Sequence, residues 1–223
     1  VCVTSTDGVE KVIFGAGGVA ETASPGMVLV DHSTSIVANT KDMAVKLKAE
    51  TGMGWVDAPV TGGPDGAEAG GLAIMAGGGD VDVAIVQSIM DNVSSAFTVF
   101  GPVGSGQVAK MVNQVLVLNN YAVLAEALAL AEAGGIDASK IPDALATGHA
   151  GSNMLKNVFP RMIKRDYAPK GYARQLLKDL DMLHDLAKRL KTPTPISSQT
   201  ASLLRILNST VHEELDGIAI MKL

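Results

Sequence analysis

One long apolar segment constrains the fold of this chain more than any other feature. From Gly106 to about Glu132 the sequence has no proline and no further glycine, and no charge occurs between Lys110 and Glu126. Proline and glycine are the residues that disfavour a helix interior most strongly, so their absence predicts one long helix. Because this helix is uncharged over most of its length, we expect it to be buried on most of its sides.

The residues before this helix alternate between strand and helix patterns. Helical spacing of apolar residues occurs at Asp7–Phe14, Thr40–Glu50 and Val81–Met90. Short apolar runs predict strands at Val1–Val3, Met27–Val30, Gly54–Val60, Leu72–Ala76 and near Phe97–Phe100. Strands that alternate with helices indicate a mostly parallel sheet.

The residues after the sequence Gly101-Pro102 are predicted to be helical only. Besides the long helix, helical patterns occur at Ala138–Thr147, Asn153–Lys164, Tyr172–Leu190 and Ser197–Leu207. We therefore predict an α/β domain over residues 1–101. An all-helical domain over residues 102–223 follows it and is entered through the long helix.

Composition narrows the classes of partner. Hydrophobic residues make up 47% of the chain and charged residues 18%, with a net charge of -5. This balance predicts a globular protein and argues against nucleic acid or an anionic membrane as partner. The most apolar stretch, Val115–Ala125, contains Asn119, Asn120 and Tyr121, and we expect it to be too short and too polar to span a bilayer.

Cysteine and histidine usage predicts neither disulfides nor a metal site. The lone Cys2 excludes an intrachain disulfide and fits a reducing compartment. We expect a cytoplasmic protein, or one of the mitochondrial matrix if a transit peptide precedes this sequence. The histidines show no metal-ligand spacing; they are His32, His149, His184 and His212.

A turn after the third predicted strand is the first candidate for a binding site. Thr61, Gly62 and Gly63 follow the strand and offer a hydroxyl group and exposed backbone N–H groups. Such an arrangement can hold a carboxylate. From spacing alone, an ordinary glycine turn is the alternative.

The start of the long helix is the second candidate. Lys110, Asn113 and Gln114 are spaced i, i+3 and i+4, so they share one helix face. Burial of the lysine beside amides would lower its pKa toward a range useful for acid–base chemistry. The alternative is a lysine whose apolar stem packs at a helix end while its amine reaches solvent.

Two further segments contain candidate polar residues. Thr34 lies in the loop after strand Met27–Val30, where an α/β sheet presents its ligand crevice. Ser33, Thr34 and Ser35 are alternatively a cap for the helix that follows. Lys178 and Asp179 lie on a helix that, taken alone, has an ordinary charged face.

Together these motifs closely resemble the 3-hydroxyisobutyrate dehydrogenase family, which includes tartronate semialdehyde and glyoxylate/succinic semialdehyde reductases. Asp57–Gly63, continuing to Gly78, resembles the family's substrate-binding motif, and Gly104–Gln114 resembles its catalytic motif. Lys178-Asp179-Leu180 resembles its cofactor-closing motif. The order and spacing also match, and the resemblance covers essentially the whole chain.

The resemblance implies a Rossmann-type domain that binds NAD or NADP, joined by a long interdomain helix to an all-α domain for substrate binding and dimerisation. It implies that Thr61, Gly62 and Gly63 hold the substrate carboxylate and that Lys110 is the general acid/base. Asn113 or Gln114 then hydrogen-bonds the reacting oxygen or orients the lysine. Thr34 and Lys178 contact the cofactor near the nicotinamide, as do Val3 and Thr4 in a strand-end loop that is usually Leu-Pro in the family.

The sequence departs from the family pattern in three respects. Thr61 stands where serine is usual, which keeps the hydroxyl group. Asn113-Gln114 stands where many members have Asn-Asn, whereas members of the tartronate semialdehyde type also have Asn-Gln. The glycine-rich fingerprint is not found, because Gly15–Gly18 is expected to lie in a loop. We therefore expect an N-terminal βαβ unit of about sixty residues to be missing, and the chain alone to bind cofactor poorly.

The predicted function is hydride transfer between NAD(P) and a small 3-hydroxy acid or semialdehyde, of the 3-hydroxyisobutyrate or tartronate semialdehyde type, in a homo-oligomer. A glyoxylate or succinic semialdehyde reductase on the same scaffold is an alternative. Imine-reducing relatives lack the catalytic lysine, so Lys110 counts against that activity. A non-catalytic dimerising module is the alternative from another class.

Overall fold

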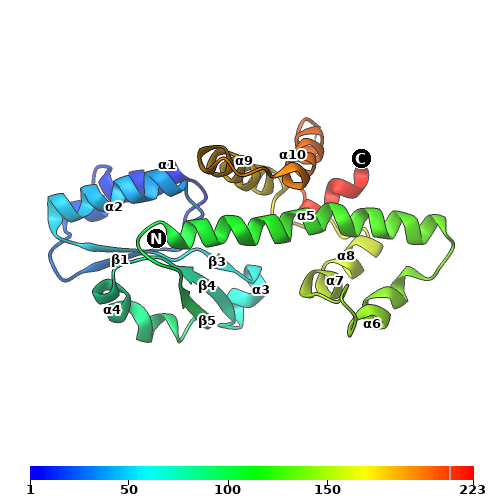
Figure 1. Cartoon of the computed structure of the whole chain (residues 1–223), viewed down its shortest axis with the longest axis horizontal. Coiled ribbons are helices and arrows are strands. Elements are labelled where there is room, and N and C mark those ends of the chain that lie inside the picture. The colour runs from blue at the N-terminus through cyan, green and yellow to red at the C-terminus, as the bar shows by residue number, and fades with distance from the viewer. Residues whose placement is uncertain (211) are drawn as a thin grey trace. The chain divides into compact units, whose positions relative to one another are not determined.

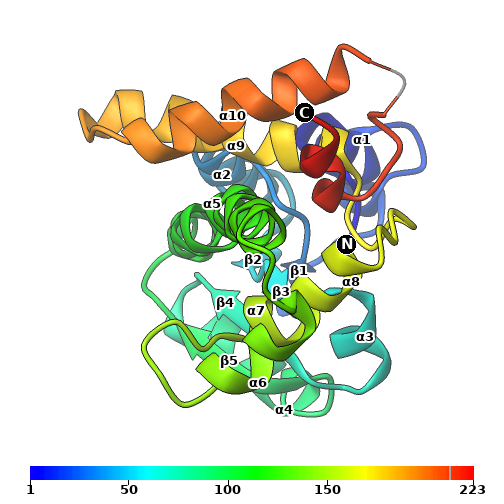
Figure 2. The ribbon, with the colours of Figure 1, turned by 90° about the vertical axis from the view of Figure 1, so that its right-hand side faces the viewer.

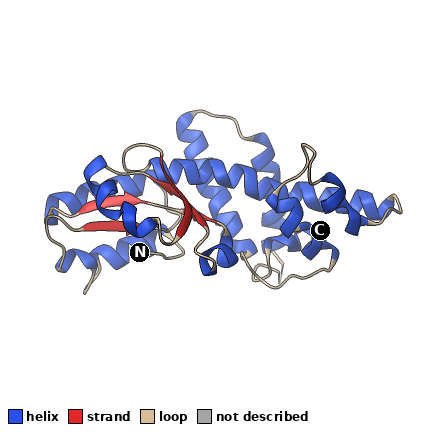
Figure 3. Cartoon of the chain, turned by 90° about the horizontal axis from the view of Figure 1, so that it is seen from below, coloured by secondary structure: helices blue, strands red, loops and turns tan. Residues whose placement is uncertain are grey.

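The structure, a computed structural model, describes residues 1–210 and 212–223, which divide into two compact units, 1–113 and 114–223. The boundary between the units lies inside helix α5 (Ser105–Ala133). All strands of the described residues belong to the first unit (Figure 3). The Rossmann-type fold followed by a helical region is thereby confirmed, while the domain boundary after residue 101 stays a prediction.

The first unit is built on short strands that are mostly parallel. Strand β1 (Val28–Asp31) pairs in parallel with β2 (Gly54–Asp57), with Asp31 opposite Asp57. Strand β4 (Leu72–Ala76) pairs in parallel with β5 (Ser94–Val99) and antiparallel with β3 (Val60–Thr61). An isolated antiparallel bridge joins Asp57 to Gly77 and so connects the two sheets.

The predicted strand Gly54–Val60 is two strands because the chain changes partner within it. Up to Asp57 the backbone pairs with β1, and from Val60 it pairs with β4. Ala58 and Pro59 lie between the two strands, and proline has no N–H group to donate to a ladder.

The predicted strand Val1–Val3 is not found. The amino group of Val1 donates to Val30 O at 2.7 Å, and Val1 O accepts a hydrogen bond from His32 N at 2.8 Å. These two bonds place Val1 beside β1, but residues 1–3 have no strand assignment.

Helices cover both faces of the β1–β2 sheet. Figure 1 shows α1 (Thr6–Phe14) and α2 (Val37–Thr51) on one face and α4 (Asp80–Met90) on the other. The buried apolar side chains of α1 and α2 pack with Leu29 and Trp55 in one cluster. A turn of 3-10 helix, η1 (Val19–Glu21), and the short helix α3 (Gly63–Glu68) were not predicted.

Helix α5 confirms the predicted long helix but is not buried on most of its sides. Met111, Leu118, Leu124 and Leu128 are buried. The large apolar side chains that remain exposed are Val112, Leu116 (63% exposed), Val123 (53%) and Leu130 (75%). The expectation was wrong because an apolar helix surface need not be covered by its own chain.

Helix α5 also bears on the membrane prediction, which considered Val115–Ala125 alone. By length and composition the whole helix is able to cross a bilayer, a test that the core helix of a soluble protein passes as well. The absence of a membrane partner therefore stays a prediction.

The second unit consists of the part of α5 from Gln114 onward and of shorter helices. Helix α9 (Ala173–Leu190) packs against α10 (Pro195–Asn208), and the two lie side by side in Figure 2. The predicted helix 153–164 is divided into α7 (Asn153–Asn157) and α8 (Phe159–Ile163), where Pro160 removes an N–H donor. The predicted helix 138–147 is the 3-10 turn η2 (Ala138–Lys140) followed by α6 (Ile141–Leu145).

The final turn, η3 (Gly217–Lys222), is held in the second unit by a buried carboxylate. Asp216 Oδ2 accepts hydrogen bonds from Lys170 N at 2.7 Å and Gly171 N at 3.2 Å, and Oδ1 accepts one from Ile218 N at 3.1 Å. Arg161 Nη1 lies 3.4 Å from Asp216 Oδ2 and balances its charge. Ile218 packs in the apolar cluster that contains Leu124 and Leu128.

Candidate active site

Lys110 is buried and its amine has a defined position. Only 8% of the residue is exposed, and Nζ donates a hydrogen bond to Val60 O at 2.8 Å. A buried lysine requires such a partner, because an amine removed from water without one is costly. The alternative, an amine that reaches solvent from a helix end, is therefore wrong in this structure.

The Thr61-Gly62-Gly63 turn directly follows the carbonyl group that Lys110 contacts. Thr61 ends β3, and Gly62 has a φ of 127°, a backbone conformation that residues other than glycine rarely adopt. Thr61 is half-buried, and both glycines are exposed. The structure thus places a hydroxyl group and two exposed glycines next in sequence to the residue whose carbonyl holds the lysine.

The first turn of α5 is fixed to β2 by Asp57. Asp57 Oδ1 accepts a hydrogen bond from Gly104 N at 2.6 Å, and Oδ2 accepts one from Gln107 N at 2.9 Å. These N–H groups have no partner inside the helix, and a carboxylate also complements the positive end of the helix dipole. Burial raises the pKa of the Asp57 carboxyl to about 6, although these hydrogen bonds and nearby backbone groups oppose the shift.

A close backbone contact reinforces this attachment. A methyl group added at Gly106 would lie 2.5 Å from the carbonyl oxygens of both Asp57 and Met75. Only glycine leaves room for α5 to approach the strand ends this closely. The turn that precedes Lys110 is consequently held by hydrogen bonds and by packing together.

The loop after β1 brings Thr34 next to the Val3–Thr4 segment. Ser33 Oγ accepts a hydrogen bond from Val3 N at 2.9 Å, and Ser33 N donates to the buried Asp31 Oδ1 at 2.9 Å. Burial raises the pKa of Asp31 above its ordinary value. Helix α2 begins after Ile36 without a side-chain cap, so the capping alternative for Ser33, Thr34 and Ser35 is wrong.

These two segments lie at the carboxyl end of β1, which is where open parallel sheets bind ligands. Thr34 is half-buried and Thr4 is exposed, so hydroxyl and backbone groups are presented there at two depths.

In the second unit, Gln114 and Lys178 share one carboxylate. The buried Asp179 accepts a hydrogen bond from Gln114 Nε2 through Oδ2, and Lys178 Nζ lies 3.1 Å from its Oδ1. Both ends of this contact lie within residues 114–223. Asn113, half-buried, is the residue of α5 that directly precedes Gln114.

Sequence reasoning assigned no role to the residues that hold these candidates, namely Asp57, Gln107 and Asp179. Each lies inside a quoted motif, but its hydrogen-bond partner is distant in sequence. The one available signal was an acidic residue at the last position of a buried strand, as at Asp57.

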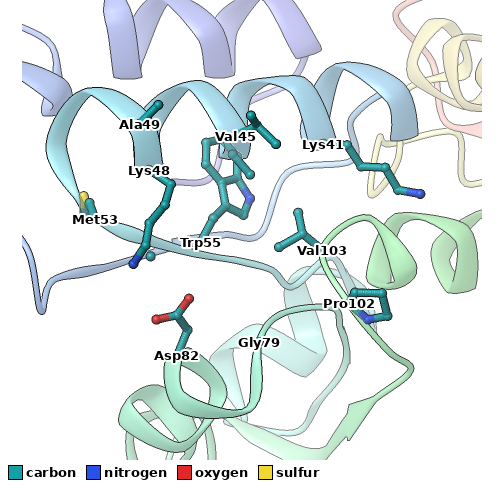
Figure 4. Close-up of a pocket in the computed structure, with 12 residues that line it drawn as sticks. Lys41, Val45, Lys48, Ala49, Met53, Trp55, Gly79, Asp82, Pro102 and Val103 are labelled. Atoms are coloured by element: carbon teal, nitrogen blue, oxygen red, sulfur yellow. The ribbon is translucent and has the colours of Figure 1, made fainter.

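A cavity of about 720 Å³ lies elsewhere in the first unit, between α2, β2 and the residues before α5 (Figure 4). Lys48 and Asp82 extend into it, and apolar side chains such as Val45 and Val103 form its walls. The predicted site residues are not among those that line it. Over residues 1–210 and 212–223, no group of three or more histidine, cysteine or acidic residues forms a metal site.

Comparisons with known proteins place both halves of the chain. Residues 1–101 match the family model of the NAD binding domain of 6-phosphogluconate dehydrogenase. Residues 104–223 match that of the NAD-binding of NADP-dependent 3-hydroxyisobutyrate dehydrogenase.

Individual relatives agree with the family models. The chain is 37% identical to an uncharacterised oxidoreductase of Synechocystis over 86% of its own length and 66% of the relative's. It is 32% identical to 2-hydroxy-3-oxopropionate reductase of Escherichia coli over 100% of its own length and 76% of the relative's. A crystal structure of 3-hydroxyisobutyrate dehydrogenase from Salmonella typhimurium superposes with a TM-score of 0.90 at 28% identity, over 99% of this chain and 77% of that one.

The chain thus spans about two thirds to three quarters of the length of these relatives. Its fold, its paired domain matches and its identity to named reductases agree with one another. The chain belongs to the 3-hydroxyisobutyrate dehydrogenase family of NAD(P)-dependent oxidoreductases.

Proposed function

We propose that the full-length protein transfers a hydride between NAD or NADP and a small 3-hydroxy acid or its semialdehyde. The observation that carries this proposal is the buried amine of Lys110. It lies 2.8 Å from the carbonyl oxygen of Val60, the residue directly before the Thr61-Gly62-Gly63 turn. A proton-transfer group and a carboxylate-binding turn are thereby adjacent, and these are the two functions that a hydroxy acid substrate requires.

In this proposal Lys110 is the general acid/base. When bound, the nicotinamide accepts or supplies the hydride at the carbinol carbon. Lys110 Nζ takes the hydroxyl proton during oxidation and returns it during reduction, while Asn113 hydrogen-bonds the same oxygen. Thr61, Gly62 and Gly63 orient the substrate through its carboxylate, assisted by Gln114.

The cofactor contacts in this proposal come from Thr34, Val3 and Thr4 in the first unit and from Lys178 in the second. The hydrogen bond between Val3 N and Ser33 Oγ supports a shared role for the first three residues. The contact between Lys178 and Asp179 supports an amine held in a fixed orientation.

The favoured substrate class is tartronate semialdehyde or 3-hydroxyisobutyrate. The Asn113-Gln114 pair supports the former, as does the likeness to 2-hydroxy-3-oxopropionate reductase, since that compound is tartronate semialdehyde. Glyoxylate and succinic semialdehyde are the alternative substrates for the same arrangement.

The test is a screen of the full-length protein with 3-hydroxyisobutyrate, D-glycerate, 4-hydroxybutyrate and L-serine, each with NAD and with NADP. Turnover of at least one hydroxy acid is expected, and Lys110→Ala is expected to lower kcat by about 10²- to 10⁴-fold while leaving the fold intact. Exposed Lys41→Ala on α2 is the matched control and is expected to retain kcat. No turnover of any substrate would favour a non-catalytic dimerising module, and a Lys110→Ala enzyme that kept its kcat would refute the acid/base role.

We further propose that the protein is a homo-oligomer that uses the exposed apolar face of α5. Leu116, Val123 and Leu130 recur at intervals of seven residues, the spacing at which helices pack lengthwise against one another.

A further inference from the structure

We propose that Gln107 is a positioning residue that fixes the Thr34 segment relative to the helix carrying Lys110, and so determines cofactor affinity. This inference rests on the proposed function in one respect, the contact of Thr34 with the cofactor. Gln107 itself contacts neither substrate nor cofactor in the proposal.

The side chain of Gln107 forms two hydrogen bonds that flank Thr34. Its Oε1 accepts a hydrogen bond from Ser35 N at 3.0 Å, and its Nε2 donates one to Ser33 O at 2.8 Å. Gln107 is fully buried, so neither end of the amide exchanges these partners with water. The amide therefore holds the backbone on both sides of Thr34, which is one of the residues proposed to contact cofactor.

Gln107 is itself held on the opposite side. Its backbone N donates to Asp57 Oδ2 at 2.9 Å, and the adjacent Gly106 packs against the carbonyl oxygens of Asp57 and Met75. Lys110 follows one helical turn later, with its own amine on Val60 O. One residue thus connects the loop after β1, the end of β2 and the helix that contains the candidate acid/base.

The chemistry of the contact selects glutamine. Ser33 O needs a donor and Ser35 N needs an acceptor, and a glutamine amide supplies one of each on a single side chain. Glutamate has the same shape but, when ionised, sets a carboxylate oxygen against Ser33 O. Methionine has similar length and supplies neither bond, which leaves two buried backbone groups without a partner.

The experiment measures binding of NADH and NADPH to the full-length protein by calorimetry between pH 5.5 and 8.5. Gln107→Glu is expected to raise the cofactor Kd about tenfold at pH 8, the scale of one buried hydrogen bond lost. Burial raises the pKa of the introduced carboxyl group, and its protonated form again donates to Ser33 O. The Kd is therefore expected to return to within about threefold of wild type as the pH falls.

Other titratable groups near this position are Asp57, whose carboxylate receives Gln107 N, and Asp31 and His32 on β1 and its loop. These groups are present in both proteins, so the ratio of variant to wild-type Kd at each pH isolates the introduced carboxyl. Gln87→Glu, at the side chain that donates to Asp91 on α4, is the matched control and is expected to bind as wild type at every pH.

Gln107→Met keeps the proposal testable if the glutamate variant does not fold at high pH. It is expected to raise the cofactor Kd at all pH values, whereas Lys110→Ala is expected to lower kcat with the cofactor Kd unchanged. A Gln107→Glu to wild-type Kd ratio that does not vary with pH, or a Gln107→Met protein with wild-type Kd, overturns the inference alone. Wild-type protein that binds neither NADH nor NADPH overturns the proposed function and the inference with it.

Discussion

Single buried carboxylates hold the candidate site together. Asp57 receives two backbone N–H groups at the start of α5 from residues 47 and 50 positions further along the chain. Local caps normally satisfy such groups, but the residue before this helix is Gly104, which has no side chain. Asp57 therefore supplies from a neighbouring strand what the local sequence lacks.

The buried Asp57 carboxyl makes stability depend on pH in a defined direction. Burial raises its pKa to about 6 in the fold from an ordinary value of 3.8, so between these pH values the folded state binds a proton that the unfolded state does not. Stability from this group thus increases as the pH falls from about 6 to about 4. Asp57→Asn is expected to remove roughly 1 to 3 kcal/mol of this pH dependence, measured by urea unfolding at pH 4 to 8.

The control for this prediction is Asp42→Asn, at an exposed carboxylate of α2. It is expected to follow the wild-type dependence of unfolding free energy on pH. If the unfolding free energies of wild type and Asp57→Asn changed with pH in parallel, Asp57 would have the same proton affinity in the folded and unfolded states, and the prediction would be wrong.

At this scale the sequence identified residue types but not their partners. Lys110, Thr61 and Thr34 were nominated from their chemistry and their positions beside predicted strand or helix ends. Gln107 was not, because its two hydrogen bonds reach residues 72 and 74 positions earlier in the chain. No spacing rule within one helix or strand contains such contacts.

Among the secondary-structure elements, the first turn of α5 has little room for a larger side chain at Gly106. Gly106→Ala would place a methyl group against two carbonyl oxygens, so the turn must shift. The expected cost is about 1 to 3 kcal/mol of stability, with a fall in kcat because Lys110 moves with the turn. Thermal unfolding and steady-state kinetics of the full-length protein measure both effects.

Gly148→Ala is the matched control, because its nearest neighbour, Leu145 O, would lie 3.6 Å from the added methyl group. It is expected to change neither property. A Gly106→Ala enzyme with wild-type melting temperature and kcat would show that the close contact is not needed.

Elements were predictable where apolar periodicity was long and uninterrupted. The long helix followed from a segment without proline or glycine, and the strand Leu72–Ala76 from a short apolar run, and both are present. Boundaries failed where a proline removed a backbone N–H donor, as at Pro59 and Pro160. The short α3 was missed because its sequence, Gly-Pro-Asp-Gly, is typical of a turn.

For the whole molecule, assembly is the property that the exposed face of α5 predicts. Val123→Glu places a charge in the middle of this face and is expected to reduce the oligomer to a smaller species in light scattering after size-exclusion chromatography. Val81→Glu, at a position of α4 that is 75% exposed, controls for the added charge and is expected to leave the mass unchanged. A wild-type protein that runs as a monomer would contradict the proposed interface.

The attachment of η3 through Asp216 has a consequence for how the molecule is made. The residues of the first unit leave the ribosome early, and the hydrogen bonds that Gly104 N and Gln107 N donate to Asp57 need nothing beyond residue 113. The helical unit needs Asp216 and Ile218 to bind its loop and fill its apolar cluster. It therefore completes its core only after Asp216 and Ile218 have left the exit tunnel, so the two units mature at different times during translation.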